Sequence, residues 1–338
     1  MPAKTSIPLS TIRKSNSRIS ELPEGLIALF IGATSGIGKS TLEQFAQYAV
    51  RPTIYIVARS ISKIADQLDQ LKSKNPEATY DVIEKDVSLI SDTNDVVKYM
   101  KSKETKLDFL YNSAGFLPMS GRFDTSEGLE PSMTTRFYTK LVAAQGLLPL
   151  LNAAEHPRVV SVLAGGQESP LVEDDMDLRK PGNFSIIKSS TQSCTMLTLS
   201  LEHLAAENPK ISFVHSFPGL VDTPLLGRGS TGVKNFLLVR VVTPILSFIA
   251  LMPEEAGART LFYMTSARFS VNGGGVPVPA GVEDEATKTA ARGVFLINEK
   301  SQSVGDEKVM EELRSRGMDK KVWEHAMATF KGALAGRA

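Results

Sequence analysis

The 338-residue sequence has little cysteine, little histidine and no excess of charge of either sign. One cysteine, Cys194, excludes an intrachain disulfide, and the lack of a Cys/His cluster argues against a structural zinc site. We therefore predict no metal, a reducing compartment and a cytoplasmic location. Lysine and arginine number 38 against 37 acidic residues, a formal net charge of +1, so neither nucleic acid nor an anionic membrane surface is an expected partner.

The sequence also lacks an uninterrupted apolar run long enough to cross a membrane. Its most apolar stretch, residues 236–252, is broken by Arg240 and Pro244, and a spanning helix needs about 20 apolar residues. The first residues lack the apolar core of a secretory signal. We predict that residues 1–24 form a solvated N-terminal arm. A mitochondrial presequence stays open as an alternative, because basic residues and serines precede the first acid, Glu21.

Short apolar runs alternate with segments of helical periodicity from residue 25 onward. This alternation predicts an α/β fold, a doubly wound and mostly parallel sheet with helices on both faces, in a single domain at 25–300. Within it, 217–252 would form an apolar substrate lid, and 301–338 would be a C-terminal helical extension. Strands are predicted at 26–32, 53–58, 80–85, 107–111, 158–163 and 211–216, and helices at 41–50, 61–74, 91–103, 130–152, 184–207 and 306–333.

A glycine-rich turn marks a candidate nucleotide site. Gly32, Gly36 and Gly38, in "FIGATSGIGKS", follow the first predicted strand and precede a helix. Glycines in this setting let backbone N–H groups approach a pyrophosphate at the helix N-terminus. Arg59 ends the second predicted strand, where an NAD-selective site would carry an acid, so NADP(H) is favoured over NAD(H). The alternative is an arginine that simply faces solvent.

Three further motifs follow in order: "DV" at 86–87, "NSAG" at 112–115 and "FPGLVDTP" at 217–224. With the glycine turn they resemble the short-chain dehydrogenase/reductase family over about residues 25–265, and "TSEGLEPSMTTRFYTKLVAAQGLLPLL" and "VWEHA" resemble a fungal branch often associated with secondary metabolism. The resemblance implies a Rossmann-like fold with NADP(H) as cofactor. Carried over by position, its cofactor-binding residues would be Gly32, Thr34, Ser35, Gly36, Ile37, Gly38, Arg59, Asp86, Val87, Asn112, Ala114, Gly115, Lys188, Pro218, Gly219, Val221 and Thr223.

The catalytic positions depart from the family pattern, which the resemblance gives as a serine, a tyrosine, a lysine four residues later and a helical asparagine. Lys188 is retained, but Phe184 stands in place of the tyrosine and Ala164 in place of the serine, while the asparagine falls at about Arg136. If the segment is helical, Phe184 and Lys188 share one face. Alternatively, Phe184 only packs beneath a substrate and Lys188 only anchors the ribose.

A replacement for the missing tyrosine is not fixed by the sequence. Lys188, a bound water, or a hydroxyl from Tyr138, Thr139 or Ser185 could donate the proton.

Two classes of function follow from these residues. The first is an NADP(H)-dependent oxidoreductase acting on a hydrophobic ketone, enone or alcohol in secondary-metabolite biosynthesis. The alternative is a non-redox isomerase, cyclase or dehydratase, or a cofactor-binding pseudoenzyme, because both the serine and the tyrosine are replaced. The apolar segment 217–252 favours a hydrophobic small-molecule substrate. Helices 130–152 and 184–207 resemble those through which relatives pair, so a homo-oligomer is open.

Overall fold

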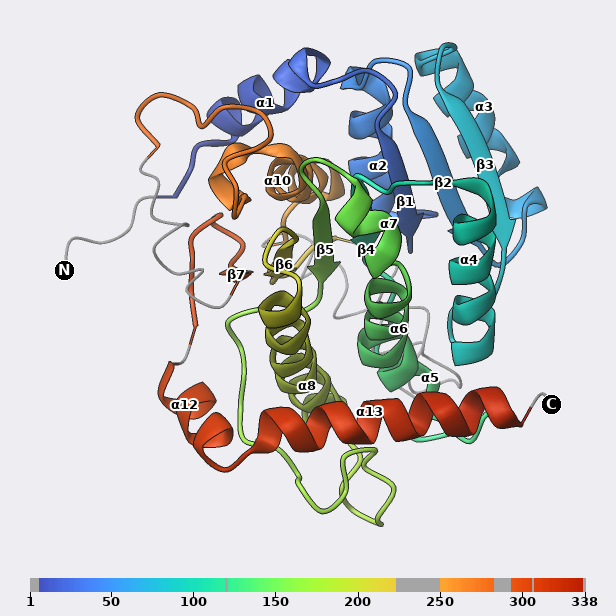
Figure 1. Cartoon of the computed structure of the whole chain (residues 1–338), viewed down its shortest axis with the longest axis vertical. Helices are drawn as coiled ribbons and strands as arrows, with labels where there is room; N and C mark the ends of the chain where they lie inside the picture. The colour runs from blue at the N-terminus through green and yellow to red at the C-terminus, as the bar shows by residue number, and fades with distance from the viewer. Residues whose placement is uncertain (1–5, 119–120, 223–249, 283–292, 306, 337–338) are drawn as a thin grey trace.

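The described residues form a seven-stranded, entirely parallel sheet with helices on both faces, in the strand order β3-β2-β1-β4-β5-β6-β7 (Figure 1). This computed structural model describes residues 6–118, 121–222, 250–282, 293–305 and 307–336. The doubly wound, Rossmann-like fold predicted from the alternation is confirmed. The strands are β1 (Ile27–Ile31), β2 (Thr53–Ala58), β3 (Thr79–Glu84), β4 (Phe109–Asn112), β5 (Arg158–Val162), β6 (Ser212–Ser216) and β7 (Val294–Ile297).

Two hydrophobic cores lie on opposite faces of the sheet because side chains alternate along each strand. In β1, Leu29 enters one core and Phe30 the other. The Leu29 core is covered by α4 (Ile90–Lys103), α6 (Thr139–Gly146) and α8 (Ile186–Glu207). The Phe30 core is covered by α2 (Gly36–Tyr48), α3 (Ala65–Lys74) and α10 (Pro253–Thr265). Burial of both faces explains why the strands read as nearly continuous apolar runs.

The N-terminal segment is not the solvated arm that we predicted. Residues Leu9–Ser17 form α1, and Arg18–Glu21 form the short 3₁₀ helix η1. Ile12 and Ile19 are fully buried in the Phe30 core. The Asn16 side-chain amide also donates a hydrogen bond of 2.8 Å to the carbonyl of Ala258 on α10. Apolar residues spaced for one helix face, together with this amide, hold the segment on the domain.

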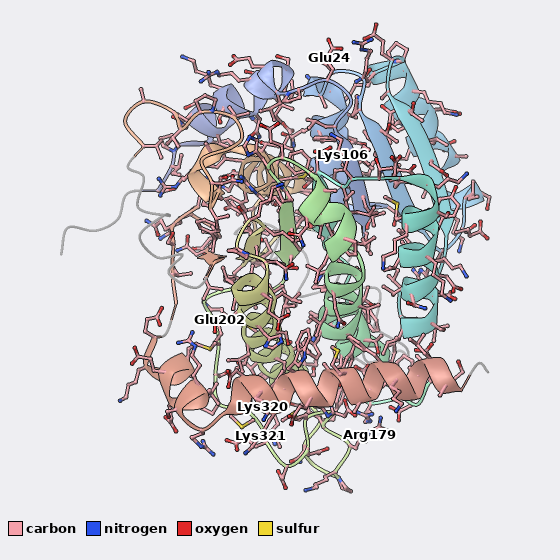
Figure 2. All side chains as sticks on the ribbon, viewed as in Figure 1. Glu24, Lys106, Arg179, Glu202, Lys320 and Lys321 are labelled. Carbon is pink, nitrogen blue, oxygen red and sulfur yellow. The ribbon has the colours of Figure 1, made fainter. Side chains whose placement is uncertain are left out.

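The C-terminal segment forms the two closing helices expected there, α12 (Glu307–Ser315) and α13 (Met318–Ala335). Helix α13 runs crosswise past α8 and the lower end of α6 in Figure 1, and it contacts α8 and α4. Met318, Val322, Ala326 and Phe330 of α13 belong to the same core as those three helices. Arg314 of α12 forms an ion pair of 2.6 Å with Glu202 of α8, which ties the two helices together. Glu202 is labelled in Figure 2.

Several elements differ from the sequence predictions. The helix predicted at 130–152 is divided into α5 (Pro131–Met133), a π-helical turn, η3 (Thr134–Tyr138), α6 and α7 (Leu148–Ala153). Strand β7 and helix α10 were not predicted. Most of the predicted lid, 223–249, lies outside the described residues. No helix in the described part of the chain combines the length and the apolar character needed to span a bilayer.

Candidate active site

A cavity of about 340 Å³ lies where the carboxyl ends of β1, β4, β5 and β6 meet the start of α8. Open parallel sheets bind their ligands at this edge. The cavity brings together eleven of the residues that the sequence singles out: Gly32, Thr34, Ser35, Gly36, Ile37, Gly38, Ala114, Gly115, Ala164, Pro218 and Gly219.

The glycine turn is shaped by close approach of the backbone to the neighbouring strand ends. Gly32 has φ +84°, and a Cβ there would lie 2.4 Å from the amide nitrogen of Ala114. A Cβ on Gly38 would lie 2.4 Å from the carbonyl oxygen of Gly32. Helix α2 then begins at Gly36 with no acid in its first turn. The turn therefore presents a helix N-terminus to the cavity, which suits a pyrophosphate.

Side-chain hydrogen bonds from buried residues hold the "NSAG" turn after β4 in place. Asn112 is 1% exposed, and its Oδ1 accepts a hydrogen bond of 3.1 Å from the amide of Ala114. Lys140 of α6 donates to the carbonyls of Asn112 and Ala114 at 2.9 and 3.1 Å. Burial, together with the charge of Arg136, lowers the pKa of Lys140 to about 7. Asn112 thus fixes the turn and does not itself line the cavity.

Four predicted cofactor residues lie at the same edge but outside the cavity lining. Arg59 is exposed directly after β2. Asp86 follows β3, and its Oδ1 accepts from the amide of Ser88 at 3.0 Å. Val87 is half-buried, and Val221 forms an isolated parallel bridge with Leu251. Thr223 falls outside the described residues.

Phe184 lies before the helix that carries Lys188, so the two do not share a helix face, and neither is among the residues that line the cavity. Helix α8 begins at Ile186, because the side chain of Ser185 caps it by accepting from the amide of Lys188 at 3.1 Å. Phe184 thus precedes the helix, and its ring centroid lies 5.8 Å from the guanidinium carbon of Arg122. The Lys188 ammonium is exposed and donates to a backbone carbonyl at 3.2 Å. Ala164, at the serine position, does line the cavity.

The sequence carries a signal for this helix boundary. Pro181 and Gly182 form a turn, with Gly182 at φ +82°, and Ser185 is a favoured N-cap residue. A helix start at Ile186 follows from these residues, whereas periodicity alone extends the helix backward to 184.

The hydroxyl groups considered as replacement acids do not line the cavity either. Tyr138 is buried and hydrogen-bonded to Asp177 and His325. Thr139 donates to the carbonyl of Val87. The hydroxyl of Ser185 caps α8.

Arg136 and Ser190 occupy the cavity wall instead. Arg136 lies in the π-helical turn η3 and is only 3% exposed. Its Nη1 donates to Ser190 Oγ at 3.1 Å, and its Nη2 donates to the carbonyl of Phe116 at 2.7 Å. Burial lowers the pKa of Arg136 to about 10. The sequence places Arg136 at the asparagine position but gives no role to Ser190, two residues after Lys188.

A buried hydrogen-bonded chain supports Ala164 from the side away from the cavity. The Ala164 amide donates to His215 Nε2 at 3.2 Å, so His215 carries its proton on Nδ1 and donates to Thr198 Oγ1 at 2.9 Å. Thr198 in turn donates to Glu168 at 2.7 Å. The thiol of Cys194 donates to the Ala164 carbonyl at 2.9 Å.

Glu168, Cys194 and His215 also have the composition of a metal-ligand group, because their donor atoms lie within 4.8 Å of one another. Hydrogen bonds already engage these atoms. Burial lowers the pKa of His215 to about 3, in the presence of the Lys140 charge, and raises the pKa of the Cys194 thiol. The group is thus arranged as a support for the turn after β5.

Comparison with known proteins agrees with this architecture. Residues 26–175 match the family described as "short chain dehydrogenase". The chain is 45% identical over 335 residues to an NmrA-like family domain-containing oxidoreductase, notO, of an Aspergillus species, covering 98% of each protein. It is 35% identical over 333 residues to oxidoreductase AN1596 of Emericella nidulans, covering 97% of this chain and 99% of that one.

A solved structure supports the same fold. The Pseudomonas aeruginosa RhlG/NADP active-site complex aligns with a TM-score of 0.53 at 20% identity, over 76% of this chain and 96% of that one. At this identity the likeness concerns the fold alone. Together with the fungal relatives and the glycine turn, it leads to one conclusion: the chain belongs to the short-chain dehydrogenase/reductase family, in the fungal branch predicted from its sequence.

Proposed function

We propose that this protein is an NADP(H)-dependent oxidoreductase that acts on a hydrophobic ketone, enone or alcohol. The observation that carries the proposal is the glycine turn, where Gly32 and Gly38 leave no room for a side chain and the N-terminus of α2 faces the cavity. This geometry fits the pyrophosphate of a dinucleotide. The fungal relatives, named as oxidoreductases, support the reaction class.

The choice of NADP(H) rests on Arg59. The side chain is exposed at the end of β2, next to the strand that leads into the glycine turn. A guanidinium there would bind the 2′-phosphate of the adenosine ribose. An NAD-selective site would instead have an acidic residue at this position, which accepts a hydrogen bond from the ribose 2′-hydroxyl. The nicotinamide, when bound, supplies or accepts a hydride. The related RhlG structure was solved with NADP, which supports this choice.

The substrate class rests on the cavity wall. Apolar side chains of Phe116, Leu117, Val162, Leu163 and Phe217 line the cavity beside Ala164. Such a wall favours a hydrophobic small molecule. We place the reaction in secondary-metabolite biosynthesis because of the fungal branch to which the chain belongs.

Fluorescence titration with NADPH and, separately, NADH tests the cofactor. We expect NADPH to bind more tightly. Transfer of a deuteride from C4-labelled NADPH to a product then tests the reaction. A product of unchanged mass, or one that has lost water, with no NADPH consumed, would replace this proposal with the isomerase, cyclase or dehydratase alternative. Absence of binding by either nucleotide would contradict the cofactor assignment.

A further inference from the structure

Arg136 gives the cavity wall a positive charge. Among the described lining residues it is the one charged side chain, and it is 3% exposed. It lies in a π-helical turn, a rare backbone form that is often found at functional sites. A desolvated cation of this kind is costly unless an anion or strong hydrogen-bond acceptors compensate it.

Neutral oxygens orient the guanidinium. Nη1 donates to Ser189 and Ser190 at 3.4 and 3.1 Å, and Nη2 donates to the carbonyl of Phe116 at 2.7 Å. The Ser190 hydroxyl donates to the carbonyl of Ile186 at 2.7 Å, which turns its lone pairs toward Arg136. A guanidinium carries more N–H donors than these described partners use. Arg136 is therefore held in place at the cavity wall with N–H donors to spare.

No carboxylate among the described residues forms an ion pair with Arg136. Glu130 acts on it only through its charge. One oxygen of Glu130 accepts from the Ser132 hydroxyl and the Met133 amide instead. Glu130 thus offsets the charge of Arg136 only at a distance, and the guanidinium has no ion-pair partner among the described residues.

A second buried basic side chain lies nearby, and its pKa of about 7 leaves it partly protonated at neutral pH. Lys140 lies one helical turn after Arg136, is 1% exposed, and is held by Asn112 and the Ala114 carbonyl. It too forms no ion pair with a described residue. Arg136 in the cavity wall and the partly protonated Lys140 beneath the adjoining turn thus lie near an apolar part of the wall, at Phe116 and Leu117.

We propose that Arg136 binds an anionic oxygen of the substrate, either a carboxylate or an enolate, carried on an apolar body. This inference names the substrate class of the proposed oxidoreductase and rests on that function. A charge-assisted bond to a planar guanidinium suits such an oxygen better than a neutral carbonyl. The cofactor also carries anionic oxygens, in its phosphates, so the test separates the two sources.

The test compares two probes of nearly equal shape, 2-naphthoate and its neutral amide, 2-naphthamide. Their affinities are measured by calorimetry with the full chain in saturating NADP⁺. We expect 2-naphthoate to bind at least about tenfold more tightly. Arg136→Gln should abolish this preference, and Arg136→Lys, which retains the charge but loses the planar fork, should retain part of it. Lys320→Gln removes an exposed charge on α13 and should change nothing.

Three results would overturn the proposal: equal binding of the two probes, an unchanged preference in Arg136→Gln, or a loss of NADPH affinity in that variant as large as its loss of naphthoate affinity. The last result would assign Arg136 to a cofactor phosphate. Thermal unfolding of each variant checks that it is folded. If Arg136→Gln does not fold, the comparison is made with Arg136→Lys. If the protein binds no NADPH, the proposed function fails, while naphthoate binding to the cofactor-free chain still tests Arg136.

Discussion

Three basic side chains at the carboxyl edge of the sheet have three different environments. Arg59 is exposed after β2, Arg136 lines the cavity, and Lys140 is buried beneath the turn after β4. Because Arg59 is exposed, it is suited to bind the 2′-phosphate of a cofactor that enters from solvent. Burial makes Arg136 sensitive to the charge of whatever fills the cavity, and it makes Lys140 an internal brace whose pKa falls to about 7.

Arg59→Ala should weaken NADPH binding by about tenfold or more, because a hydrogen bond to a charged group contributes about 1.5–3 kcal/mol. NADH binding should change little, since NADH lacks the 2′-phosphate. Fluorescence titration of both nucleotides measures the difference. Arg51→Ala is the matched control, because Arg51 is an exposed arginine just before the start of β2, at the end of the strand opposite to Arg59. Equal losses for NADPH and NADH would contradict the role of Arg59.

His215 should make stability depend on pH. Burial lowers its pKa to about 3, whereas an unfolded histidine has a pKa of about 6.5. Between these values the unfolded chain binds the extra proton, so the free energy of unfolding falls as pH drops below about 6.5. Urea unfolding at about pH 7 and about pH 5 should show a smaller drop in His215→Gln than in the wild type. His156→Gln, with its ring partly exposed, serves as control. If the free energy of unfolding falls by as much in His215→Gln as in the wild type, His215 is not the source of the pH dependence.

At the scale of the element, the start of α8 determines which side chains reach the cavity. The cap at Ser185 leaves Phe184 outside the helix and Lys188 in its exposed first turn. Ser190 then faces the cavity and accepts from Arg136. Because of this short turn and cap, the cavity is lined by Arg136 and Ser190, and not by Phe184 and Lys188, the pair expected from the family.

Ser185→Ala should destabilise the protein by about 1 kcal/mol, the usual cost of losing an N-cap side chain. Urea unfolding measures this loss. Ser185→Asp, which restores an acceptor for the Lys188 amide, should recover most of it. A larger loss in Ser185→Asp than in Ser185→Ala would show that the cap is not what stabilises this end of α8.

The sequence predicts those elements whose signal is local. Six of the seven strands follow from apolar runs, and the glycine turn is recognised because Gly32, Gly36 and Gly38 are contiguous with a strand and a helix. The four residues of β7, Val294–Ile297, are too few to give a clear period. Ser190 is recognised only in three dimensions, because its partner Arg136 lies far away in the sequence. The burial that fixes α1 likewise depends on α10.

At the scale of the whole molecule, other parts of the same chain cover most of the surface of α6 and α8. Residues 192–201 of α8 are buried on every side of the helix, as are residues 139–144 of α6. The sheet covers one side, and α13 packs against the outer side of α8. The surfaces of α6 and α8, through which relatives were expected to pair, are thus largely enclosed within one chain.

We therefore expect a monomer of 36.6 kDa in solution. Size-exclusion chromatography with light scattering over a range of protein concentrations measures the mass directly. A stable dimer would show that another surface mediates pairing. If a dimer forms, exposed-surface substitutions on α13, such as Lys320→Glu, would test whether that helix takes part.

The position of α13 has a consequence during synthesis. Its residues Met318, Val322, Ala326 and Phe330 are translated after α4, α6 and α8, yet they complete the core that those helices form. Until α13 has left the ribosome, that apolar surface lacks the cover that α13 gives it. We therefore expect the nascent protein to need protection from aggregation until α13 has emerged and packed.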